Sequence, residues 1–105
     1  MPQAPGIVKS ASGGNRFTAS FVIDGIQYNL VGNLSPSVEE FNSFDASLEY
    51  NSAADLTSNQ NFQGRLGNAD LSFSFENGTK ITGSLQMPQG MKTEVNGAGT
   101  WVVVN

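Results

Sequence analysis

Residues 16–34 read RFTASFVIDGIQYNLVGNL, and this stretch decides the fold. Apolar side chains alternate with small or polar ones on both sides of Asp24-Gly25, as is typical of strands with one buried face. Asp-Gly between two such runs predicts a two-residue type I′ turn, because that turn needs positive φ at both central residues. The expected pairs are Ile23 with Ile26, Phe21 with Tyr28, and Ala19 with Leu30. Since the apolar partners all share one face, turn and pattern agree on a β-hairpin.

The same alternation recurs along most of the chain. A flexible lead is expected over 1–5, followed by a short strand at about 6–11. The segment 35–41 resembles a helix start, because Ser35 can cap and Pro36 suits the first helical position, and it predicts a single turn. Further strands are expected over 44–50, 62–66, 69–75, 79–85 and 95–104.

Two more hairpins follow from turn residues. Gly67-Asn68 predicts a two-residue turn that sets Leu66 against Ala69, Gly64 against Leu71, and Phe62 against Phe73. At 76–78 a two-residue turn would mix the two faces of the strands. A three-residue loop with Gly78 in the left-handed region instead pairs Phe73 with Ile81 and Leu71 with Gly83, and we expect this bulged form.

Seven or eight short strands with no crossover helix predict an all-β, single-domain antiparallel meander over 1–105. The register places five glycines on the inner face, where they allow strong coiling and make room for large neighbours. These glycines are Gly32, Gly64, Gly83, Gly97 and Gly99. They favour a closed or nearly closed small β-barrel, with a β-sandwich of the same strands as the alternative. The aromatic residues expected inside are Phe17, Phe21, Tyr28, Phe44, Tyr50, Phe62, Phe73, Phe75 and Trp101.

Composition excludes several classes of function. The 105 residues contain no Cys and no His, which removes disulfides, thiol nucleophiles and the commonest general base. The net charge is −4 and the five Lys and Arg are scattered, so nucleic acid is a poor partner. No apolar run is long enough for a membrane span, and no secretory h-region is visible, so either a cytoplasmic protein or a mature secreted form is expected.

Acidic residues and oxygen donors give weak signals for catalysis or metal binding. Glu39, Glu40, Asp45 and Glu49 lie close in sequence, but their expected places are a turn and the outer face of a strand. A solvated surface explains them better than a carboxylate pair for catalysis. The remaining oxygen donors lack the spacing of a calcium loop, so neither a metal nor a cofactor is expected.

The leading expectation for function is a non-catalytic binding module. A surface rich in Asn, Gln, Ser and Thr suits a neutral glycan, with Arg65 and four aromatic residues as ligand-binding candidates. The aromatic candidates are Trp101, Tyr28, Tyr50 and Phe62. One alternative is a barrel pocket that carries a small apolar molecule or shapes it as a cyclase would. Another is a self-associating protein that pairs through strand edges at 7–8 or 102–104.

Overall fold

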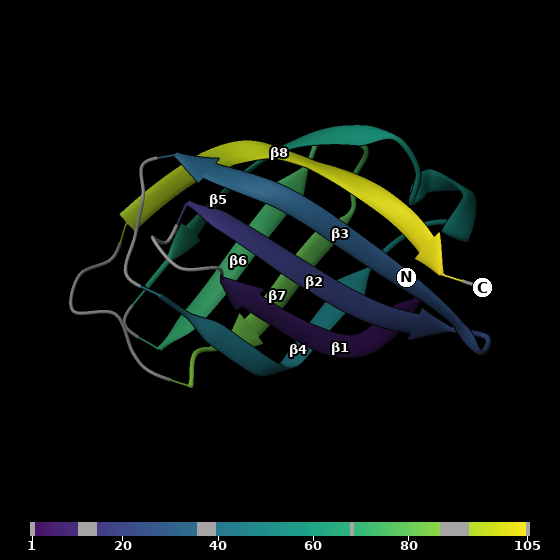
Figure 1. Cartoon of the computed structure of the whole chain (residues 1–105), viewed down its shortest axis with the longest axis horizontal. Helices are drawn as coiled ribbons and strands as arrows, with labels where there is room; N and C mark the ends of the chain where they lie inside the picture. Colours follow the sequence, from purple (N-terminus) through teal and green to yellow (C-terminus); the bar gives the residue numbers. More distant parts are fainter. Residues whose placement is uncertain (1, 11–14, 36–39, 68, 87–92, 105) are drawn as a thin grey trace.

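The computed structural model describes residues 2–10, 15–35, 40–67, 69–86 and 93–104, with the backbone alone for Ala53. Within these ranges eight antiparallel strands close into one barrel (Figure 1). The strands are β1 (Gln3–Ser10), β2 (Arg16–Ile23), β3 (Ile26–Ser35), β4 (Asn42–Glu49), β5 (Asn59–Leu66), β6 (Asp70–Phe75), β7 (Lys80–Ser84) and β8 (Thr93–Val104). A 3₁₀ turn, η1 (Ala53–Asp55), lies between β4 and β5. The predicted all-β barrel is therefore confirmed.

The order of the strands differs from a plain meander. Around the barrel it runs β1-β2-β3-β8-β5-β6-β7-β4, so that β4 returns to pair with β1 and β8 returns to pair with β5. Each half of the chain is therefore a Greek key, and the two halves join through β3–β8 and β4–β7. Tight turns force neighbours in sequence to pair, whereas the longer connections before β4 and β8 leave room to cross an end of the barrel. The meander prediction is therefore corrected at three connections, because β3 does not pair with β4, β4 does not pair with β5, and β7 does not pair with β8.

Two of the three predicted hairpins have the expected register. Asp24 and Gly25 have φ of 52° and 79°, as a type I′ turn requires, and all three expected pairs of that hairpin occur. In the β6–β7 hairpin Gly78 has φ of 89°, and the Phe75 N–H donates to the Thr79 carbonyl oxygen at 2.8 Å. Its strand pairs are Phe73 with Ile81 and Leu71 with Gly83, as predicted.

The β5–β6 hairpin is shifted by two residues from its prediction. Leu66 lies opposite Leu71 and Gly64 opposite Phe73, and the loop is closed by the Gly67 N–H donating to the Asp70 carbonyl oxygen at 2.8 Å. A shift of two keeps every side chain on its face, so the apolar pattern cannot distinguish the two registers. The Phe73 ring decides between them, because it packs over Gly64.

The remaining expectations concern the N-terminal lead and two of the connections between strands. β1 begins at Gln3, so residues 3–5 belong to a paired strand instead of the flexible lead expected over 1–5. The single turn expected over 35–41 lies largely outside the described residues, as does the turn at 87–90. No helix in the described part of the chain is long and apolar enough to cross a membrane.

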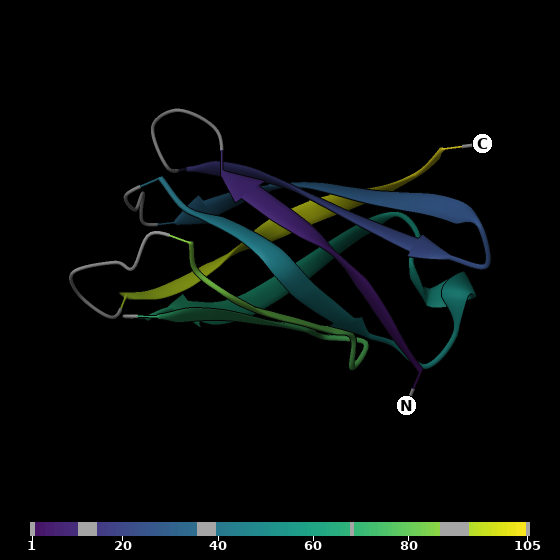
Figure 2. The same ribbon diagram turned by 90° about the horizontal axis from the view of Figure 1, so that it is seen from below.

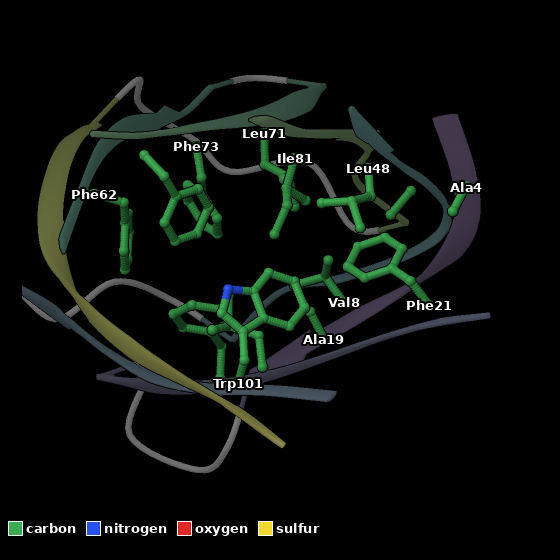
Figure 3. Close-up of a cluster of buried hydrophobic side chains, with 14 of the residues drawn as sticks. Ala4, Val8, Ala19, Phe21, Leu48, Phe62, Leu71, Phe73, Ile81 and Trp101 are labelled. Carbon is green, nitrogen blue, oxygen red and sulfur yellow. The ribbon is translucent and has the colours of Figure 1, made fainter. Parts of the chain in front are cut away.

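Large side chains from all eight strands fill the interior (Figure 3). The Phe62 ring centre lies 5.0 Å from that of Phe73 and 5.6 Å from that of Phe17, with the Phe17 ring edge-on. The ring centres of Trp101 and Phe21 lie 6.5 Å apart, nearer the end of the barrel that contains the turn between β2 and β3. Such ring pairs add about 0.5–1.5 kcal/mol each beyond the area that they bury.

Phe44 breaks the predicted pattern and is 55% exposed. Between the pairs Gly6–Ala46 and Val8–Ser43, two residues of β4 lie opposite the single residue Ile7. This bulge changes which face the next side chain takes, so Ser43 turns inward and Phe44 outward. The inward prediction for Phe44 is therefore wrong, because alternation holds only where a strand has no bulge.

Candidate functional site

Polar side chains on the outer face of β5, β6 and β8 form rows that run across the strands. One row crosses seven of the eight strands and contains Ser35, Asn96, Gln63, Ser74, Lys80, Glu49 and Gln3. The row beside it contains Glu94, Arg65, Ser72, Thr82 and Ser47. Directly opposed side chains stand about 5 Å apart at Cβ, so neighbours in a row can bind one ligand together.

These rows line an open hollow of about 780 Å³ on the outside of the barrel wall. We call it the polar hollow and define it by six side chains. They are Gln63 and Arg65 of β5, Ser72 and Ser74 of β6, and Glu94 and Asn96 of β8. β5 lies between β8 and β6, so its two residues occupy the middle of the surface. The hollow presents amides, hydroxyls and one charge of each sign.

Arg65 is the cation at the centre of the polar hollow. Its partners across the strands are Glu94 on β8 and Ser72 on β6. Within the described ranges its guanidinium makes no hydrogen bond or ion pair, and the side chain is exposed. A guanidinium carries five N–H donors in a planar fork. These donors are therefore available to a ligand.

Carboxylates outnumber Arg65 on this side of the barrel. Glu94 lies in the polar hollow, and an adjoining hollow of about 380 Å³ adds Asp45 and Asp70 beside the same arginine. When Lys80 and Glu49 of the neighbouring polar row are counted as well, two positive charges lie among four negative ones, and this surplus of negative charge repels anionic ligands.

Asp45 also has a structural role at the bulge of β4. Its Oδ1 accepts the Ser84 N–H at 3.0 Å and the Ser43 hydroxyl at 3.2 Å. The hydrogen bond from the Ser84 amide lowers the pKa of Asp45 below its ordinary value, and hydrogen bonds from the Ser84 and Ser43 hydroxyls lower it to a smaller extent. The carboxylate thus continues the contact between β4 and β7 beyond the last strand pair, Ser47 with Thr82.

The structure does not bring the five predicted ligand-binding residues together. Trp101, Tyr50 and Phe62 are buried in the core, and Tyr28 is partly buried against it. Arg65 alone of the five lies on the outer face, on the opposite side of the wall. A ligand cannot stack on a tryptophan that is 6% exposed without opening the barrel.

Comparison with protein-family models, curated proteins and solved structures finds no match for this chain. The site must therefore be interpreted from its own chemistry. In the described part of the chain, no three acidic side chains gather closely enough to hold a metal ion, and the sequence has no His or Cys.

Sequence reasoning missed five of the six residues of the polar hollow. Each one occupies an outward position in an alternating strand, so each was recognisable as a surface residue. Their convergence depends on β8 lying beside β5 and on the true register of β5 with β6. Neither relationship follows from a meander with a two-residue turn at 67–68.

A separate, apolar hollow of about 670 Å³ lies on the outer face of β1, β2 and β4. Pro5, Ile7, Val22 and Phe44 contribute its apolar side chains, and Phe44 reaches it because of the bulge. Gln3 and Ser47 lie at its border and also end the two polar rows. The barrel therefore has a polar outer side and an apolar one.

Proposed function

We propose that the protein is a non-catalytic binding module for a neutral oligosaccharide, and that the polar hollow is its binding site. The observation that carries the proposal is the lining of this hollow. Gln63 and Asn96 offer amides, Ser72 and Ser74 offer hydroxyls, and Arg65 offers free donors, all on one open surface.

The chemistry of this lining matches that of sugar hydroxyls. Each hydroxyl of a sugar both donates and accepts a hydrogen bond, and an amide side chain does the same through separate atoms. The planar fork of Arg65 can donate to two neighbouring oxygens at once. The surplus of carboxylates around Arg65 favours a neutral ligand over a sulfated or carboxylated one.

The dimensions favour a chain of sugars over one small molecule. From Ser35 on β3 to Ser74 on β6 the row crosses three steps between strands, or about 14 Å at the usual strand spacing. An open hollow buries little of its ligand, so affinity must come from several modest hydrogen bonds in a line.

The barrel holds these side chains in fixed relative positions. Gln63 and Arg65 alternate along β5 with Phe62, Gly64 and Leu66, and both Phe62 and Leu66 are buried in the core. Binding groups on strands of a packed scaffold are more precisely placed than groups on loops. The alternative of an internal apolar ligand has less support, because packed phenylalanine rings occupy the interior.

Titration of the ¹⁵N-labelled protein with neutral oligosaccharides, chosen from a glycan array, tests the proposal. The expected result is a set of amide shifts centred on Gln63, Arg65 and Asn96. Arg65→Ala should weaken binding about ten- to hundredfold, since a hydrogen bond to a charged group contributes about 1.5–3 kcal/mol. Arg16→Ala is the matched control, because it removes an exposed arginine from the start of β2 and should leave affinity unchanged.

Three outcomes contradict the proposal. One is the absence of binding to any neutral glycan at millimolar concentration. Another is a set of shifts that centres on the apolar side of the barrel near Phe44. The last is an equal loss of affinity in Arg65→Ala and Arg16→Ala.

A further inference from the structure

The last residues of β8 have a strand on one side and none on the other. β8 pairs with β3 as far as Gln27–Val104, but with β5 only as far as Asn59–Thr100. In Figure 2 the C-terminal end of β8 lies away from η1. Within the described residues, the closed barrel therefore has a short free edge at the end of β8.

Backbone hydrogen bonds show which groups lie on this edge. The Trp101 N–H donates to the Ser58 carbonyl oxygen at 3.2 Å, so the backbone groups of Trp101 face away from β3. In an antiparallel pair, every second residue directs its N–H and C=O to the same side. Val103 therefore directs both groups outward, and it has no backbone partner in the described part of the chain.

The side chains around this edge are apolar and uncharged. Val102, Val103 and Val104 are 48%, 45% and 43% exposed, and Val31 of β3 is exposed close by. Proteins usually protect a free edge with a lysine, a proline or a bulge, or cover it with another segment. The stretch 100–104, TWVVV, has none of these residues, and valine has a high β-propensity.

We infer that this edge pairs with the same edge of a second copy, antiparallel and about a two-fold axis at Val103. Val103 and its counterpart then exchange two N–H···O bonds, which satisfies the free donor and acceptor of each copy. Val102 lies opposite Val104 of the second copy, and the reverse pair is equivalent. The segment is complementary to itself because every cross-strand pair is valine on valine.

The expected dimer is weak and closed. Two hydrogen bonds and a few valine pairs form a contact smaller than that of a stable complex, so dissociation is expected at micromolar to millimolar concentrations. A two-fold contact uses the same edge of both copies, so assembly stops at the dimer. This pairing is independent of the polar hollow, whose residues on β8 are Glu94 and Asn96 at the other end of the strand.

Sedimentation velocity from micromolar to millimolar protein tests the inference. The wild type should shift from monomer towards dimer as concentration rises, and the Val103 amide should become more protected from hydrogen exchange. Val102→Lys should abolish the shift, because it places a charge in the paired edge of each copy. Val22→Lys is the matched control: it makes the same change at an exposed valine of β2, which β3 separates from β8, and should dimerise like the wild type.

A second variant tests the hydrogen bonds separately from the side chains. Val103→Pro removes the N–H that faces away from β3, so it should prevent dimerisation without removing a backbone hydrogen bond inside the barrel. Far-UV circular dichroism shows whether each variant keeps its fold. The inference is overturned if the wild type stays monomeric at millimolar concentration, if it grows beyond the dimer, or if folded Val102→Lys and Val103→Pro dimerise as the wild type does.

Discussion

Gly64 lies directly opposite Phe73, and the Phe73 ring occupies the space that a side chain on Gly64 would need. A Cβ on Gly64 would come within 2.8 Å of the Phe73 Cδ1 and 2.1 Å of the Ser72 carbonyl oxygen. A similar relationship recurs where the Phe17 ring lies 2.7 Å from the Cβ position of Gly32. Inward glycines thus set the positions of the rings that fill the barrel.

Gly64→Ala should therefore lower the free energy of unfolding by about 3 kcal/mol, at the upper end of the overpacking range. The added methyl group meets the backbone of β6 as well as a ring, so a rotamer change of Phe73 cannot relieve the contact. Chemical denaturation measures the loss. Ser74→Ala, on the outer face of β6, is the control and should change stability by less than about 0.5 kcal/mol. A loss below about 1 kcal/mol for Gly64→Ala would contradict the close packing of Phe73 on Gly64.

Two phenylalanines with similar sequence surroundings should respond differently to truncation. Phe73→Ala removes a fully buried ring and should lower the free energy of unfolding by about 3–5 kcal/mol. Phe44→Ala removes a ring that the bulge turns outward and should change it by less than about 1 kcal/mol. Urea denaturation of the two variants side by side makes the comparison. Equal losses would mean that the strand alternates without a bulge.

Asp45 should make stability depend on acid pH. The Ser84 N–H donates to its carboxylate and lowers the pKa of Asp45 in the folded protein. The ionised carboxylate is therefore more stable in the folded state than in the unfolded chain. That contribution is fully present above the ordinary aspartate pKa of about 3.9, and it is lost as pH falls through the lower pKa of the folded state.

Asp45→Asn removes this dependence. The variant should be less stable than the wild type at neutral pH, and the difference should shrink as the solution is acidified below the ordinary aspartate pKa. Thermal unfolding followed across this pH range gives the measurement, with Asp70→Asn as a matched carboxylate variant on the same side of the barrel. A stability difference between Asp45→Asn and the wild type that stays constant with pH would exclude the role of this carboxylate.

Much of the fold could be predicted because local signals and burial agree along most strands. The positive φ values of Asp24 and Gly25 and the bulged register at Gly78 both follow from turn residues combined with alternation. The position of β8 between β3 and β5 could not be predicted, since no local signal specifies which strand a long connection reaches. The outward orientation of Phe44 could not be predicted either, because no fixed sequence pattern specifies a β-bulge.

The candidate site was less predictable than the fold. Arg65 was predicted to point outward and was named as a ligand-binding candidate, and in the structure it lies at the centre of the polar hollow. Tyr28 and Trp101 were chosen because a polar tip suggests a ligand contact, but the tip of a buried ring can also be accommodated within a core. Nothing in the sequence around Gln63 or Asn96 indicates a ligand contact, and the two residues come together only through the pairing of β5 with β8.

Trp101 provides a final test that separates the two locations considered for the ligand. It is the single tryptophan of the chain and it is buried, so its fluorescence reports the interior. An oligosaccharide in the polar hollow should shift the amides of Gln63 and Asn96 while leaving the emission maximum and intensity of Trp101 unchanged. Trp101→Phe should bind the same sugar with unchanged affinity, whereas Trp101→Ala should lower the free energy of unfolding by about 3–5 kcal/mol. A sugar-dependent change in Trp101 emission would instead place the ligand against the aromatic core, because fluorescence responds to contact with the indole and the outer face lies across the barrel wall from it.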